Sequence, residues 1–171
     1  MDGQTVGQFD AQAEAELARW HEQLHEGSYR PHPARRVWIP KPGRSEQRPL
    51  GIPAVRDRVV QSALRHVVEP IFETEFAGHS YGFRPGRGCP DARRRVDALL
   101  QSGHVWVVDA DLKSYFDTIP HDRLMAMVKD RIADGRVLAL VESYLRAGVL
   151  AELQRGPPTE RGTPQDRKSV V

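Results

Sequence analysis

Apolar residues in the first part of the chain recur every three or four positions. The repeating positions are Phe9, Ala13, Leu17, Trp20 and Leu24. This spacing places them on one stripe of an amphipathic helix, and Gly27 is expected to end that helix. Similar stripes predict helices over residues 59–72, 92–100, 120–132 and 137–144. We assign the helix over 59–72 to the core, with Pro70 expected to kink or end it.

Two short β-prone runs follow the first predicted helix, at residues 35–39 and 48–52. The residues between them are rich in turn formers, which predicts a hairpin with a basic tip. A further strand is predicted at 149–153, and the stretch 78–88 is expected to be a loop rich in Gly, Pro and Arg.

An apolar run, Val105 to Val108, leads directly into two carboxylates. Four consecutive apolar residues predict a strand covered on both faces. Alternation along such a strand puts Asp109 and Asp111 on the same face. Two adjacent acids repel each other unless a cation lies between them, and a divalent ion such as Mg²⁺ prefers oxygen ligands of this kind. An ordinary acidic strand end is the alternative that the residues alone leave open.

Basic residues gather in two stretches, although the formal net charge of the chain is only +2. Residues 30–65 contain nine Arg or Lys against two acidic residues, and residues 84–95 contain five Arg against Asp91. Arginine suits bidentate phosphate contacts, so a nucleic acid partner is one interpretation. An arginine-rich composition that reflects a GC-rich genome is the other.

Several classes of protein are disfavoured by the sequence. Cys89 is the only cysteine, which excludes an internal disulfide and fits a reducing, bacterial cytoplasm. The chain contains no run of 18 apolar residues and no basic segment followed by an apolar one at its start, so we expect neither membrane insertion nor secretion. His21 and His25 share a helix face without a second pair of ligands, which indicates surface residues rather than a zinc site.

Four ordered blocks of the sequence resemble the reverse transcriptases of group II introns, which are also called maturases. The blocks span Arg35 to Gln61, Ser80 to Gly88, Val105 to His121 and Gly162 to Gln165. Together the resemblance covers residues 2–165. It implies an α+β, right-hand polymerase fold, in which residues 1–104 form the fingers with an N-terminal helix and a basic hairpin. Residues 105–165 would form a partial palm.

The resemblance also implies roles for individual residues. Asp111 is the expected catalytic carboxylate, and it would bind Mg²⁺ together with the backbone carbonyl of Leu112. Two such ions act in the complete enzyme, where they stabilise the attacking oxygen and the leaving pyrophosphate. Phe116 would lie against the sugar of the nucleotide and exclude a ribose 2′-hydroxyl, which selects dNTPs. Without the resemblance, Phe116 is better interpreted as a core aromatic.

Other positions would contact the nucleotide or the nucleic acid. Lys41, Arg48 and Gln165 fall where the family binds the incoming nucleotide, and Lys and Arg suit its triphosphate. Exposed hairpin charges are the alternative for Lys41 and Arg48. The nucleic acid would be bound by Arg35, Arg36, Arg84 and Arg87. The implied partners are an RNA template, a DNA primer, dNTPs and the intron RNA. Asp117 and His121 recur in the family motif, and we interpret them as structural, with Asp117 capping a turn and His121 opening a helix.

The pattern departs from the family after Gln165. Two glycines and an apolar segment are expected there, but residues 166–171 read Asp-Arg-Lys-Ser-Val-Val. Our hypothesis is that this tail is non-native and derives from a translated sequencing adapter. A natural truncation or a frameshift is the alternative. The Tyr-x-Asp-Asp motif that supplies the remaining catalytic carboxylates does not occur in the sequence, so we expect the chain alone to be inactive as a polymerase.

Two other functional settings are compatible with these blocks. The chain could be a non-catalytic, maturase-like RNA-binding protein that assists folding of the intron RNA. Reverse transcriptases of retrons, diversity-generating elements and CRISPR loci also share the blocks, but the matches at Gly51 to Pro53 and at Gly82 to Pro85 favour the mobile group II intron type.

Overall fold

The computed structural model describes residues 4–40, 43, 45, 47–112, 115–151, 154–155 and 160–163. The chain forms two compact units. The first unit comprises Met1–Leu64 with Ser114–Val171, and the second comprises Arg65–Lys113. The division into fingers (1–104), palm (105–165) and non-native tail (166–171) stays a prediction. The tail and the last two residues of the predicted palm lie outside the described residues.

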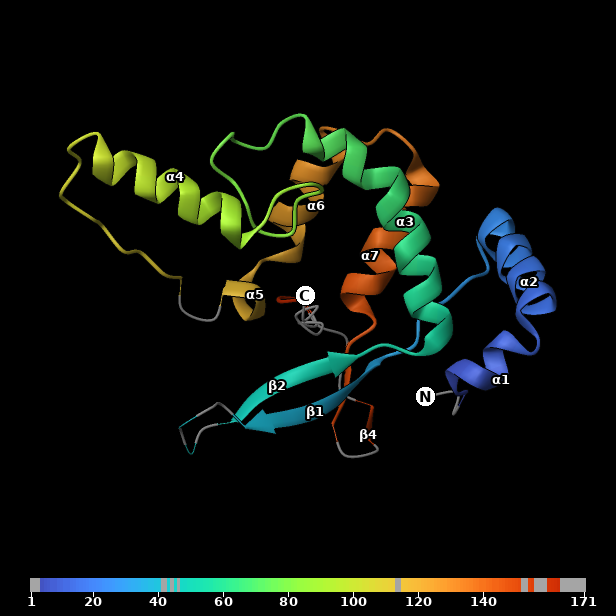
Figure 1. Cartoon of the computed structure of the whole chain (residues 1–171). Coiled ribbons are helices and arrows are strands. Elements are labelled where there is room, and N and C mark those ends of the chain that lie inside the picture. The colour runs from blue at the N-terminus through green and yellow to red at the C-terminus, as the bar shows by residue number, and fades with distance from the viewer. Residues whose placement is uncertain are drawn as a thin grey trace. The chain divides into compact units, whose positions relative to one another are not determined.

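The first unit begins with two helices where the apolar stripe predicted one. Helix α1 spans Val6–Asp10 and α2 spans Ala13–Glu26 (Figure 1). Thr5 and Gln8 form a reciprocal capping box at the start of α1, which satisfies amide groups that lack a partner in the helix. Gly27 ends α2 in the left-handed conformation, at φ 72°, as predicted. Trp20 is buried and stacks on Phe9, with 5.4 Å between the ring centroids.

The predicted hairpin is confirmed and forms one side of a four-stranded sheet, with β2 at the edge. Strand β1 (Ala34–Pro40) pairs antiparallel with β2 (Gln47–Ile52), from Arg35 opposite Ile52 to Pro40 opposite Gln47 (Figure 1). Strands β3 (Val149–Ala151) and β4 (Gln154–Arg155) complete the sheet in the order β2-β1-β3-β4. Since β3 runs parallel to β1, the C-terminal part of the unit joins the N-terminal hairpin. The predicted strand at 149–153 is confirmed for Val149–Ala151.

Three further helices belong to the first unit: α5 (Tyr115–Thr118), α6 (His121–Lys129) and α7 (Gly135–Arg146). Pro120 stands at the N-cap of α6, one position before the helix that was expected to include it, and His121 is the first residue of the helix, as predicted. The Asp134 side chain accepts hydrogen bonds from the amides of Arg136 and Val137 at 2.8 and 3.1 Å. These bonds hold the start of α7 and keep the pKa of Asp134 below its ordinary value.

Helix α3 (Val55–Glu73) continues through Pro70 and contributes residues to both units. Pro70 cannot donate a backbone hydrogen bond, and the helix ends within one turn after it. Burial is confined to the start of the helix, at Val55, Asp57 and Val60. The assignment of the whole helix to the core is therefore wrong, because Val67 is 61% and Ile71 39% exposed.

The second unit contains helix α4 (Cys89–Gln101), which is preceded by the predicted loop and followed by Gly103 at φ 92°. The predicted strand at Val105–Val108 is not formed. Residues 104–112 have no regular structure, and the side chains from Val105 to Val108 are 75–93% exposed. A strand needs a neighbouring strand for its backbone hydrogen bonds, and none of the described strands pairs with this segment.

The described helices include none that is both long enough and apolar enough to cross a lipid bilayer.

Candidate functional site

Two segments that are distant in sequence meet in the first unit and form a hydrogen-bonded part of the candidate site. Residues 160–163 run along the backbone of residues 116–121. The contact consists of three amide donors and their carbonyl acceptors: Thr163 to Phe116 at 2.8 Å, Gly162 to Ile119 at 2.9 Å, and His121 to Glu160 at 3.2 Å. Residues of the third and fourth blocks noted in the sequence are thereby joined directly.

Gly162 allows this close approach of the two backbones. It is buried, with φ at 80°, a conformation that residues with a side chain rarely adopt. A Cβ atom at this position would lie 2.9 Å from the carbonyl oxygen of Asp117 and 3.1 Å from its Cα. The sequence suggested Gly162 only as part of a motif, and the structure provides the physical reason for the glycine.

His121 strengthens the same contact through its side chain. The ring is buried, and its Nε2 lies 2.6 Å from the carbonyl oxygen of Gly162. A carbonyl only accepts hydrogen bonds, so Nε2 carries the proton and donates. His121 thus holds residues 160–163 against the start of α6, in agreement with its predicted structural role.

Phe116 lies on α5 in the same unit. Its ring is 47% exposed and makes an edge-to-face contact with Tyr115, which is 50% exposed, at 5.4 Å between centroids. The alternative in which Phe116 is an ordinary core aromatic is therefore not supported, because about half of the ring surface is open to solvent. An exposed ring beside the 160–163 segment is free to contact a ligand.

The predicted metal ligands Asp111 and Leu112 belong to the second unit, at the end of the irregular segment 104–112, and both are exposed. Among the described residues, no group of three or more His, Cys, Asp or Glu side chains is placed to hold a metal ion. One carboxylate and one backbone carbonyl are nevertheless oxygen donors of the kind that Mg²⁺ takes, and this ion commonly keeps water and substrate phosphate as its other ligands.

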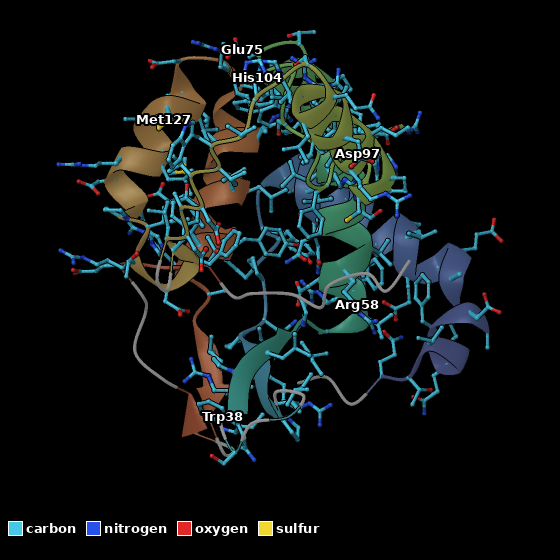
Figure 2. The ribbon with its side chains drawn as sticks, turned by 60° about the vertical axis from the view of Figure 1, so that its left-hand side comes forward. Trp38, Arg58, Glu75, Asp97, His104 and Met127 are labelled. Carbon is cyan, nitrogen blue, oxygen red and sulfur yellow. The ribbon has the colours of Figure 1, made fainter. Side chains whose placement is uncertain are left out.

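Two basic positions of the hairpin, Arg35 and Arg36, are surface residues. Both are exposed on β1, and the Arg36 guanidinium lies 6.0 Å from the ring centroid of Trp38. Figure 2 shows Trp38 on the hairpin. The backbone of Arg48 lies in β2, opposite Ile39. The predicted nucleotide contacts Lys41 and Gln165 lie outside the described residues.

Arg84 is buried inside the loop that precedes α4, which the sequence did not suggest. All five N–H groups of its guanidinium donate hydrogen bonds within 3.4 Å, and the acceptors are the Glu73 carboxylate and the carbonyl oxygens of Glu73, Ala77 and Ser80. The guanidinium also lies 4.8 Å from the ring centroid of Phe76. Since no donor remains for a phosphate, we no longer expect Arg84 to contact nucleic acid in this conformation.

Its partner Glu73 is held as an anion by this arrangement. The hydrogen bonds from Arg84 lower the pKa of Glu73 below its ordinary value. Arg87, the other basic residue predicted in this loop, remains exposed, and its side chain donates a single described hydrogen bond, to the carbonyl of Gly78 at 2.8 Å. Arg87 is therefore the residue of this pair that remains available to a phosphate.

A buried polar cluster around Asp57 was missed by sequence reasoning. The Asp57 carboxylate is completely buried and accepts hydrogen bonds from the Tyr29 hydroxyl at 2.7 Å and the His32 amide at 3.1 Å. The Tyr144 hydroxyl donates to the backbone carbonyl of Asp57 at 3.3 Å. This cluster joins the segment before β1, the start of α3 and helix α7.

The phenols of the Asp57 cluster are kept protonated. Burial, followed by the hydrogen bond to Asp57, raises the pKa of Tyr29 to about 12. Burial also raises the pKa of Tyr144, with its hydrogen bond to Tyr29 as the next cause. The residues are too far apart in sequence to form a periodic pattern, and the only local signal was a carboxylate beside the apolar stripe of α3.

Comparisons with known proteins agree with this architecture. Residues 39–166 match the family model described as reverse transcriptase (RNA-dependent DNA polymerase). Protein YkfC of Escherichia coli K12 is 43% identical over 152 residues, which cover 86% of this chain and 40% of that protein. The group II intron-encoded protein LtrA of Lactococcus lactis is 36% identical over 156 residues, which cover 91% of this chain and 26% of the relative.

A solved structure shares the fold at lower sequence identity. A chain of a partial Cas6-RT-Cas1–Cas2 complex matches 96% of this chain with a TM-score of 0.56, at 21% identity and over 27% of its own length. The fold is thus the α+β arrangement of a partial reverse transcriptase. The chain belongs to the reverse transcriptase family, of the group II intron-encoded maturase type. It spans 40% or less of the length of the two curated relatives described above.

Proposed function

We propose that this chain supplies the fingers and the first palm segment of an RNA-directed DNA polymerase that extends a DNA primer on an RNA template. The observation that carries this proposal is the contact between residues 160–163 and residues 116–121. It joins the backbone of the proposed sugar-contacting Phe116 to the segment that leads to Gln165. The backbone of Phe116 would then be held beside a bound nucleotide by the hydrogen bond from Thr163.

The incoming dNTP would be bound by four residues in different parts of this arrangement. Phe116 would pack against the sugar and exclude a 2′-hydroxyl, and its partial exposure supports this role. Lys41 and Arg48 on the hairpin would bind the triphosphate, where a point charge and a planar fork are both suitable. Gln165, two positions after Thr163 in the sequence, would also contact the nucleotide.

Asp111 and the carbonyl of Leu112 would hold Mg²⁺, and the exposure of both residues supports access for the ion and the substrate. When bound, the ions would compensate the charge that develops on the transferred phosphate. The role of this chain would be to orient the nucleotide and to supply oxygen ligands to the metal ion. Further carboxylates are required, and the sequence contains no Tyr-x-Asp-Asp motif to supply them.

The RNA template and DNA primer would be bound through phosphate contacts by Arg35, Arg36 and Arg87. All three side chains are exposed, and each phosphate contact releases counterions, so binding should weaken as salt rises. Fluorescence anisotropy with a labelled single-stranded RNA tests this: affinity should fall steeply between 50 and 200 mM KCl. Replacing both Arg35 and Arg36 by Gln should reduce the salt dependence. Binding that is insensitive to salt would contradict the proposal.

Polymerase chemistry is tested by primer extension in two settings. The 171-residue chain alone should incorporate no dNTP. A chimaera in which residues 39–163 replace the matching segment of the lactococcal relative should extend a primer, and Asp111→Asn in that chimaera should lower the rate more than a hundredfold. Asp109→Asn is the matched control and should have a much smaller effect. A folded chimaera that is unaffected by Asp111→Asn would overturn the role of Asp111.

A second candidate function is RNA binding without catalysis, as an aid to folding of an intron RNA in the bacterial cytoplasm. The exposed basic residues of the first unit favour it, since they do not depend on the metal ligands. Its discriminating result is salt-dependent RNA binding by the 171-residue chain that survives Asp111→Ala. Loss of RNA binding in this variant would contradict the second candidate.

A further inference from the structure

The loop between α3 and α4 presents one side chain in an unfavourable conformation. Phe83 has a φ of 56° and is the only non-glycine residue with positive φ among the described residues. Its side chain is 78% exposed. A bulky residue in this region of the Ramachandran plot is strained, and the exposed ring gains nothing from burial. Glycine would suit this position better on grounds of stability alone.

The neighbouring residue explains how this conformation is maintained. Arg84 is 8% exposed and donates all five of its guanidinium hydrogen bonds to the end of α3 and the first half of the loop. The backbone must therefore turn so that Arg84 points inward. Two further turn bonds, from Ser80 to Ala77 at 2.9 Å and from Arg87 to Arg84 at 3.4 Å, fix the loop on either side. The hydrogen bonds of Arg84 and of the two turns thus hold the backbone in the conformation that leaves Phe83 exposed.

The exposed charges of the same unit favour a polyanion over an apolar partner. Arg87 and the side chains of Arg93, Arg94 and Arg95 on α4 are all exposed in the same unit. Arg94 is paired with Asp91 at 2.6 Å, and the other three make no described ion pair. Aromatic rings held beside basic groups bind single-stranded nucleic acid, because each base offers a flat face for stacking.

We propose that Phe83 is a stacking platform for a base of single-stranded RNA. The proposal rests on the RNA binding inferred above and assigns one specific contact to it. Strain that is retained at an exposed position, and supported by the ion pair of the buried Arg84 with Glu73, is expected where a side chain serves a ligand rather than the fold. The flanking Arg87 would neutralise the phosphate next to the stacked base.

Three substitutions in the 171-residue chain test the platform against a twelve-nucleotide, fluorescein-labelled single-stranded RNA at 50 mM KCl. Phe83→Gly should weaken binding about tenfold, the effect typical of one lost base stack. Phe83→Tyr keeps the ring and should bind like the parent chain. Phe83→Leu keeps apolar bulk without an aromatic face and should lose nearly as much affinity as the glycine variant.

Thermal unfolding of the same variants separates function from structure. Phe83→Gly should leave the Tm unchanged or raise it, because the strain at φ 56° disappears. Failure of the parent chain to bind RNA would overturn the proposed function itself. Binding by the parent and the Phe83→Gly variant with equal affinity would overturn only the platform. A large fall in Tm on Phe83→Gly, or full binding by Phe83→Leu, would also overturn it, since the ring would then serve folding or a non-aromatic contact.

Discussion

At the scale of single residues, Gly162 makes the most demanding contact in the first unit. Gly162→Ala should lower the free energy of unfolding by about 1–3 kcal/mol, because it combines a left-handed φ with a Cβ that meets the backbone of Asp117. Urea denaturation followed by circular dichroism measures this. Gly135→Ala is the matched control: nothing lies within 4 Å of its Cβ position at the start of α7, so stability should be unchanged or slightly higher. Equal effects of the two substitutions would contradict the close approach.

Asp57 is expected to be the most sensitive polar residue of the first unit. Asp57→Asn should cost about 2–4 kcal/mol, because the amide cannot satisfy both the Tyr29 hydroxyl and the His32 amide as acceptor. Tyr144→Phe removes only the hydroxyl that bonds the Asp57 carbonyl and should cost about 1 kcal/mol. Combining Asp57→Asn with Tyr29→Phe should be less costly than the sum of the two. Strict additivity would indicate that the cluster is not coupled.

At the scale of elements, the loop before α4 depends on the charge of Glu73. The lowered pKa of Glu73 means that the ion pair with Arg84 stabilises the fold at pH values above the ordinary glutamate pKa of about 4.3. Stability is lost as the pH falls from there through the lowered pKa. Amide hydrogen exchange of residues 74–88 should therefore accelerate at acid pH relative to α7. In Glu73→Gln this additional acceleration should disappear, and its persistence would contradict the assignment.

Local patterns predicted the longer helices and the hairpin because their information lies within a few residues, but they missed the break between α1 and α2 and the short α5. The spacing of Leu17, Trp20 and Leu24 is sufficient for α2, and Gly27 ends it for a steric reason. The segment at Val105–Val108 failed because a strand depends on a partner, and the apolar run carries no information about whether the partner is present. Burial of α3 was overestimated for a similar reason: a stripe shows which face is apolar and not how far the covering elements extend.

The candidate site was predicted unevenly for the same reasons. Motif resemblance suggested Phe116, His121 and Gly162, and the structure joins these residues through hydrogen bonds. The motif resemblance did not distinguish the buried Arg84 from the exposed Arg87, which lies three positions later. The acceptors of Arg84 come from the end of α3 and the first half of the loop, and most of them lie before the motif. The Asp57 cluster requires residues 28 and 87 positions away, which no local window detects.

At the scale of the whole molecule, the exposed apolar segment from Val105 to Val108 should promote self-association. Unpaired, β-prone and uncharged residues of this kind pair readily between copies. Sedimentation velocity should show oligomers that grow with concentration, and Trp106→Lys with Val108→Lys should restore the monomer. Val67→Lys, at an exposed apolar position on α3, is the control and should leave association unchanged. A monomer at all concentrations would refute this expectation.

The three tryptophans of the chain differ widely in exposure: Trp20 is 2%, Trp38 53% and Trp106 93% exposed. Emission from an indole shifts to the red and becomes open to collisional quenchers when water reaches it. Trp20, stacked on Phe9, is therefore the tryptophan whose emission should report unfolding of the first unit, whereas the emission of the exposed Trp106 should change little on unfolding. A variant that retains only Trp20 would convert the N-terminal stack into an optical reporter that needs no added dye.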